Sequence, residues 1–212
     1  MRIFAGVYWS ARREDVSQCA MRAEKHFAML ADVSENLSQW YRGGRRKPAA
    51  DMCVDARSPQ VLGMLLNEGV NRKDVGAEIM HELGFGLSLW NRDSGGWSVG
   101  TTVKCGLYSQ NKNLSNVANL SIEVEENKAP NSATMVGVLE RLIEIWEPES
   151  GRVEQNFMPP YEGDEVPRGE DILYASYWVS RAGEKGRGGA VERFGRGWLW
   201  RSAELAWRAP SA

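Results

Sequence analysis

The sequence contains little of what most catalytic and membrane-spanning proteins need. Its 212 residues include only two histidines and three cysteines. No apolar run approaches the roughly 18 residues of a membrane-spanning helix, and no glycine-rich stretch has the strand–loop–helix context and Lys-Ser/Thr ending of a phosphate-binding loop. We therefore predict that the protein is not an enzyme, and that it has no catalytic residues, no metal site and no cofactor.

The few cysteines and histidines also lack partners in the sequence. Cys19, Cys53 and Cys105 are an odd number and lie far apart, which favours reduced thiols in the cytoplasm over a disulfide framework. We expect each thiol to act as a small buried hydrophobe. The residues around His81 begin like a zinc-protease motif, but Phe85 stands where the second histidine is needed. His81 is therefore expected to be a hydrogen-bonded histidine and not a metal ligand.

Charge is present but unevenly distributed, although the net charge is only −2. Residues 121–171 hold 13 acidic and four basic residues, a balance of −9. Residues 181–212 hold seven basic and three acidic residues, a balance of +4. The middle of the chain is thus acidic and its tail basic. The simplest interpretation is that the acidic residues solvate a helix face and its loops.

Hydrophobic periodicity and capping residues predict the main elements. Helices are expected at residues 14–31, between Ser58 and Gly69, and at 133–147, and strands at 2–9, three times within 77–126, at 172–179 and at 198–200. This order predicts an α+β fold, with an antiparallel or mixed sheet of about five to seven strands and about three helices packed on it. Residues 1–180 are predicted to form one domain. Residues 181–212 are a C-terminal extension, and the sequence does not decide whether it is ordered; one alternative is that it supplies a last strand of the same domain.

Nine tryptophans are the most unusual feature that is present. Four fall within or at the ends of apolar elements and are expected in the core: Trp9, Trp90, Trp146 and Trp178. Five fall in or near loops and the tail: Trp40, Trp97, Trp198, Trp200 and Trp207. Tryptophan is enriched in binding hot spots and is also common where a strand edge meets solvent. For the second group both interpretations remain open.

Several short motifs occur in an order that resembles a known family. They are Tyr8-Trp9 ahead of Arg12-Arg13-Glu14, Trp40-Tyr41-x-Gly43, Asn71-Arg72-x-Asp74, Leu83-Gly84, Trp90-Asn91, Cys105-Gly106 and Trp146-x-Pro148. Together they resemble the immunity protein 52 family of bacterial polymorphic-toxin systems, over about residues 2–178. Members are small cytosolic inhibitors encoded beside a nuclease toxin of the restriction-endonuclease type, in systems of bacterial competition that include type VI secretion.

The resemblance implies a protein that neutralises a co-encoded, secreted nuclease toxin by covering its active or assembly surface, without catalysis. A nuclease offers cations to phosphate, so an inhibitor can present carboxylates to the same groups. The acidic toxin-binding residues that we expect are Glu123, Glu125, Glu126, Glu144, Glu147 and Glu149, with Trp97 or Trp40 as aromatic anchors. The family-motif residues expected mainly to maintain the fold are Trp9, Arg12, Asp74 and Trp90.

Two other functions remain as alternatives. The first is a nucleic-acid-binding module, in which the loop from Arg42 to Lys47 and the Arg/Gly/Trp-rich tail bind a single strand. The acidic middle of the chain opposes this alternative because it repels a phosphate backbone. The second is an enzyme whose site forms from scattered residues, for which a deep pocket containing His81 and a carboxylate would be the sign.

Overall fold

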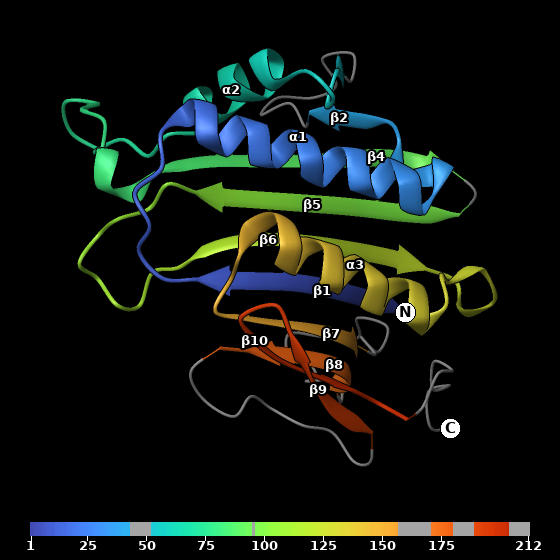
Figure 1. Cartoon of the computed structure of the whole chain (residues 1–212). Helices are drawn as coiled ribbons and strands as arrows, with labels where there is room; N and C mark the ends of the chain where they lie inside the picture. Colours follow the sequence, from blue (N-terminus) through green and yellow to red (C-terminus); the bar gives the residue numbers. More distant parts are fainter. Residues whose placement is uncertain (43–51, 95, 157–170, 180–188, 204–212) are drawn as a thin grey trace, which may run out of the picture.

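Strand β1 (Arg2–Trp9) lies in the middle of a sheet that runs through the whole molecule (Figure 1). It pairs with β6 (Asn116–Val124) on one side and β7 (Ser150–Asn156) on the other, antiparallel to both. Alternate residues Ile3, Ala5 and Val7 are fully buried on one face. The strand predicted at residues 2–9 is therefore confirmed, and it is central in the sheet.

The computed structural model describes residues 1–42, 52–94, 96–156, 171–179 and 189–203. Their strands form one antiparallel sheet in the order β3-β2-β4-β5-β6-β1-β7-β8-β10-β9. The other strands are β2 (Trp40–Arg42), β3 (Met52–Val54), β4 (Phe85–Ser94), β5 (Trp97–Cys105), β8 (Asp171–Trp178), β9 (Ala190–Phe194) and β10 (Gly197–Arg201).

Three helices cover one face of this sheet (Figure 1): α1 (Val16–Val33), α2 (Pro59–Glu68) and α3 (Ser132–Trp146). Asp15 caps α1 by accepting the backbone N–H of Gln18, and the Gln18 side chain accepts the N–H of Asp15 in return. This reciprocal pair fixes the first turn of α1. Ser58 caps α2, with Pro59 at its first position. Helix α1 lies between α2 and α3.

The predicted α+β class and three helices are confirmed, but the number of strands is wrong: the described residues form a sheet of ten strands, not five to seven. Strands β2 and β3 have three residues each, too few for an alternating pattern. Strand β7 contains one large apolar residue, Val153, and β9 is almost entirely exposed. Neighbouring strands, not their own hydrophobicity, hold these segments in the sheet.

The prediction of three buried thiols is wrong at one position. Cys19 and Cys105 are buried, whereas Cys53 on the short strand β3 is exposed. Successive side chains of a strand point to opposite faces. Val54 is opposite the buried Trp40, so Cys53 lies on the other face of the sheet, opposite Tyr41.

Candidate functional site

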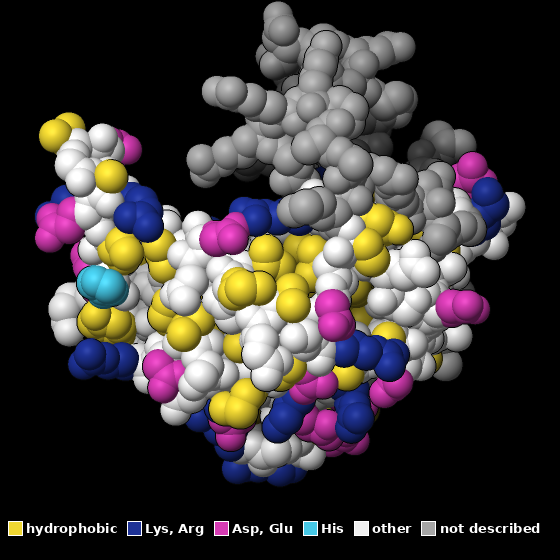
Figure 2. Space-filling view, turned by 90° about the horizontal axis from the view of Figure 1, so that it is seen from above, with side chains coloured by type: hydrophobic (Ala, Val, Ile, Leu, Met, Phe, Trp, Pro, Cys, Tyr) yellow, Lys and Arg dark blue, Asp and Glu magenta, His cyan; other side chains and the backbone are white. Residues whose placement is uncertain are grey.

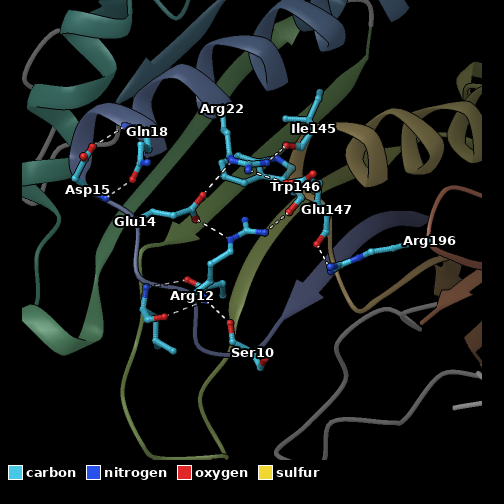
Figure 3. Close-up of polar contacts among 12 residues, drawn as sticks. Ser10, Arg12, Glu14, Asp15, Gln18, Arg22, Ile145, Trp146, Glu147 and Arg196 are labelled. Atoms are coloured by element: carbon cyan, nitrogen blue, oxygen red, sulfur yellow. Dashed lines mark hydrogen bonds and ion pairs between the residues drawn. The ribbon is translucent and has the colours of Figure 1, made fainter. Parts of the chain in front are cut away.

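The C-terminal end of α3 is surrounded by three arginines, one just before α1, one within α1 and one in the β9–β10 turn (Figure 3). Arg12 Nη1 donates to the Trp146 carbonyl at 2.9 Å, and Arg22 donates to the Ile145 carbonyl. Arg196 donates to the carbonyls of Glu147 and Pro148. The last carbonyls of a helix have no partner within the helix and carry its negative dipole end. The three arginines, hereafter the arginine cluster, supply hydrogen-bond donors to these carbonyls and place positive charge at the negative end of the helix.

Two carboxylates balance the arginine cluster. Glu14 lies between Arg12 and Arg22, with Nε–Oε distances of 3.1 and 3.0 Å, and its side chain is only 7% exposed. Glu147 lies 2.8 Å from Arg22 Nη2 and is exposed. The hydrogen bond from Arg22 lowers the pKa of Glu147. Glu147 also ends α3 in the left-handed conformation, with φ of 47°.

A buried polar chain lies beneath this cluster. Trp146 stacks on Trp9 with ring centroids 5.2 Å apart, and its indole N–H donates to His26 Nδ1 at 3.2 Å. Thr101 Oγ1 donates to the Asn119 carbonyl at 2.5 Å, so His26 Nε2 donates to Thr101 at 3.1 Å. Burial lowers the pKa of His26 to about 3. A neutral histidine thus connects α1, α3 and the sheet.

An open groove of about 850 Å³ runs between α1 and α3 beside the arginine cluster. Carboxylates predominate among its charged residues, five against three: Glu14, Glu24, Asp32, Glu144 and Glu147 against Arg22, Lys25 and Arg141. Met21, 52% exposed, adds a flexible apolar contact. On the face seen in Figure 2, acidic and basic side chains lie intermixed and not in patches of one sign.

The acidic residues expected to bind a toxin fall into two groups at opposite ends of β1. Glu123 is paired with Arg2 at the start of β1, and Glu125 lies 3.0 Å from Lys128 nearby. Glu149 lies at the other end, where its backbone N–H donates to the Tyr8 carbonyl. Seven residue steps along a strand span about 23 Å. The two groups therefore do not form one continuous face, and the side chain of Glu126 lies outside the described residues.

The second acidic group gathers around the end of α3. Glu144 is exposed and paired with Arg141 at 3.0 Å, and Glu147 is paired with Arg22. Glu149 accepts from the Ser10 hydroxyl at 2.6 Å. Every one of these carboxylates has a partner, and all three remain exposed. Their charge is partly neutralised, but they are accessible to a second protein.

Burial argues against both tryptophans that were expected as anchors. Trp40 is 1% exposed, packs edge-on against Phe27 at 5.3 Å, and donates its indole N–H to the Leu37 carbonyl. Trp97 is 9% exposed and donates to the Lys128 carbonyl at 2.8 Å. Neither ring offers a partner a large apolar surface. Among the described tryptophans, Trp198 on β10 is the one with a strongly exposed ring, at 42%.

Of the four family-motif residues, two belong to the buried cluster, one is half-buried elsewhere and one is exposed. Trp9 and Arg12 belong to the buried cluster, with the Arg12 guanidinium 5.0 Å from the Trp9 ring centroid. Trp90 is half-buried and lies 6.0 Å from the Tyr41 ring. Asp74 is exposed in a turn between Arg72 and Ile79, where no described contact gives it a structural role.

The basic segments proposed to bind nucleic acid lie mostly outside the described residues. This applies to Arg45, Arg46 and Lys47, and to the parts of the tail at 181–188 and 204–212. Arg42 is described, and it pairs with Glu68. Arg196 and Arg201, from the described part of the tail, are engaged by α3 or its flanking loop. These three arginines are therefore engaged in contacts within the chain.

The positions that sequence motifs connect with catalysis lie in a short exposed helix and within a strand. His81 is exposed in a short 3-10 helix and lines none of the described grooves. Gly96-Trp97-Ser98-Val99-Gly100 matches Gly-x-Ser-x-Gly, but Ser98 lies inside β5 and no helix follows it, as a nucleophile elbow requires. Within the described part of the chain, no three His, Cys, Asp or Glu side chains are grouped to hold a metal.

The β9–β10 hairpin carries exposed residues that were not expected to contact a toxin. Val191 is 41% exposed and Trp198 is 42% exposed, and the Arg193 guanidinium lies 5.4 Å from the Trp198 ring centroid. Little in the sequence indicated a hairpin here because β9 lacks a hydrophobic pattern, although the Trp198-Leu199-Trp200 alternation did predict its second strand. Sequence inspection also missed Arg22, whose partners at the end of α3 lie more than 100 residues away.

Comparison with known proteins gives one family and one fold. The family model "Immunity protein 52" matches residues 2–183. A solved structure entitled "Pseudomonas aeruginosa T6SS protein PA0821" is similar with a TM-score of 0.51 and 15% identity, over 99% of this chain and 70% of that chain. At this identity the likeness concerns the fold alone. No curated protein matches the sequence significantly. No helix in the described ranges has the length and apolar character to cross a membrane.

Proposed function

The chain belongs to the immunity protein 52 family, and from that premise we propose that it binds and neutralises a toxin encoded beside its own gene. The proposed toxin is a secreted nuclease of the restriction-endonuclease type. The proposed mechanism is occlusion: the protein covers the active or assembly surface of the toxin and performs no chemistry. The observation that carries this proposal is the family match over 182 residues, from residue 2 to 183.

The proposed contact surface is the end of α3 with the adjoining α1–α3 groove. Glu144, Glu147 and Glu149 remain exposed there, on a frame held rigid by the arginine cluster. A rigid surface loses little conformational entropy on binding, which favours affinity. Exposed carboxylates attract the cations with which a nuclease holds phosphate, and this attraction accelerates encounter more than it adds affinity. Met21 supplies an adaptable apolar contact beside them.

Nuclease inhibition tests the proposed function directly. The purified toxin domain is incubated with DNA and RNA substrates while this protein is added in increasing amounts. We expect cleavage to stop at about one equivalent, because one surface blocks one toxin. Unchanged cleavage at a tenfold excess would contradict neutralisation. A toxin that cleaves no nucleic acid but is still bound would contradict only its assignment as a nuclease.

Charge substitution at the two acidic groups tests the proposed contact surface. Glu144→Lys combined with Glu147→Gln alters the group at the end of α3. The matched control, Glu123→Lys combined with Glu125→Gln, makes the same change in charge at the far end of β1. We expect the first pair to slow association at low salt by about tenfold, and the control to leave it unchanged. Equal association rates for both variants would reject this surface.

A further inference from the structure

The hairpin of β9 and β10 forms one edge of the sheet. No described strand pairs with the outer side of β9, and the first four of its five residues are exposed, on both faces. An edge strand presents alternate unpaired backbone N–H and C=O groups, which template pairing with another strand. The opposite edge, β3, has only three residues. Short edge strands are a common protection against such pairing, so β9 is more available than β3 for pairing with an added strand.

Side chains beside this edge form a small exposed patch. Trp198 on β10 is opposite Arg193 on β9, and residues opposite each other share one face of a sheet. Val191, two residues from Arg193, lies on that face as well. Tryptophan and arginine are among the residue types that dominate binding energy in protein interfaces, and Val191 adds an exposed aliphatic side chain beside them. An aligned strand can thus gain both backbone hydrogen bonds and side-chain contacts.

The hairpin is continuous with the acidic end of α3. Arg196, in the turn of the hairpin, donates to the Pro148 carbonyl at 3.0 Å. A hollow of about 340 Å³ lies between them, with Glu144, Glu147 and Phe194 among its lining residues. The hairpin also lies beyond residue 183, where the family match ends. Phe194 lines this hollow, so strand alternation places Val191, Arg193 and Trp198 on the other face of the sheet. The edge of β9 itself adjoins the proposed contact and lies outside the matched family region, so it is suited to recognise one particular partner.

We propose that an extended segment of the co-encoded toxin pairs with β9 as an eleventh strand of the sheet. An apolar side chain of that segment packs on Val191 and Trp198, and a carboxylate lies opposite Arg193. The hairpin thereby determines which toxin the protein recognises, while the end of α3 supplies the general charge attraction. This inference rests on the proposed function, because it assigns the occupant of the edge to the toxin.

Isothermal titration of the full chain with the toxin domain tests the proposal. The edge variant combines Val191→Lys with Trp198→Ala, which places a charge beside the edge and removes the exposed ring. The control variant combines Leu114→Lys with Met64→Ala, at residues 37% and 59% exposed and far from the hairpin in sequence. Truncating a hot-spot tryptophan typically weakens binding by about 30-fold. We expect at least that loss in the edge variant and unchanged affinity in the control.

Hydrogen exchange on the wild-type complex gives a second measurement that does not depend on a variant folding. We expect the amides of residues 190–194 to exchange at least about tenfold more slowly when toxin is bound, because new strand pairing protects them.

Each outcome separates the two proposals. Tight wild-type binding with unchanged affinity of a folded edge variant, or with unchanged exchange in β9, overturns the inference and leaves the proposed function intact. An edge variant that turns a dimer into a monomer without weakening toxin binding assigns the edge to a second copy, and also overturns it. Absence of wild-type binding overturns the proposed function, and the inference with it.

Discussion

At the end of α3, four successive carbonyls receive hydrogen bonds from the arginine cluster, and Glu14 beside them is almost fully buried. At the neighbouring β9–β10 hairpin, an edge strand is exposed on both faces beside an exposed tryptophan. The first region lies mainly inside the family match and the second lies beyond it. The first region is held by buried contacts and the second is open, and we propose that the first supports a contact surface while the second selects the partner.

The largest expected effect is the loss of the central tryptophan of the first region. Trp146→Ala removes a fully buried ring that stacks on Trp9 and donates to His26. Truncating buried aromatic residues to alanine costs about 3–5 kcal/mol in the free energy of unfolding. Urea denaturation followed by circular dichroism measures this cost. A loss below 1 kcal/mol would show that the region does not hold the fold together.

A smaller but substantial effect is expected from Glu14→Gln. The substitution removes the carboxylate between Arg12 and Arg22, whose side chains are 28% and 27% exposed. Breaking a fully buried ion pair costs about 3–5 kcal/mol, and partial exposure of the arginines reduces our expectation to about 2–3 kcal/mol.

The matched control for Glu14→Gln is Glu123→Gln, which breaks an exposed pair with Arg2. This control should cost less than about 1 kcal/mol by the same denaturation measurement. Equal costs for the two variants would remove the distinction between a buried and a surface ion network.

The buried histidine predicts a specific pH dependence. His26 has a folded pKa of about 3, below its unfolded pKa of about 6.5. Between these values the unfolded state binds a proton that the folded state does not, so stability falls as the pH falls through 6.5. From pH 7.5 to 5.5 this effect removes about 1.4 kcal/mol.

Denaturation curves at the two pH values should show this loss in the wild type. His26→Gln should lack it, whereas the exposed control His81→Gln should retain it. A His26→Gln variant with the full wild-type pH dependence would contradict the buried, neutral state of His26.

The smallest effect on stability is expected at the hairpin. Trp198→Ala truncates a ring that is 42% exposed, so the free energy of unfolding should fall by less than about 1 kcal/mol. The same substitution should weaken toxin binding strongly, if the hairpin selects the partner. If Trp198→Ala lowered the free energy of unfolding as much as Trp146→Ala, the hairpin would be as important for the fold as the end of α3, and the proposed difference between the two regions would be contradicted.

The sequence predicts the part of the fold that depends on local patterns. The alternation in β1, the capping of α2 by Ser58 and Pro59, and the apolar stripe of α3 are local signals that tertiary structure preserves. Strand β7 could not be predicted in this way, because it is held by β1 and β8 on either side and contains mainly polar or small residues. The number of strands depends on such long-range pairing.

The candidate site is less visible in the sequence for the same reason. Tryptophan burial is decided by packing: Trp40 and Trp198 both occur near loops, yet one is in the core and the other on the surface. The acidic block is continuous in sequence, but the antiparallel course of β1 and β6 separates Glu123 from Glu149 by the length of a strand. The role of Arg22 becomes apparent only when α1 and α3 lie side by side.

Titration of this protein with the toxin domain encoded beside its gene, followed by calorimetry, tests the central claim most directly. We predict a one-to-one complex with a nanomolar or lower dissociation constant, about −12 kcal/mol or more favourable. Such a complex would establish the toxin as the partner and give the reference for every variant above. The absence of binding heat across temperatures at micromolar concentrations, with both proteins folded, would contradict the claim that this protein neutralises that toxin by binding it.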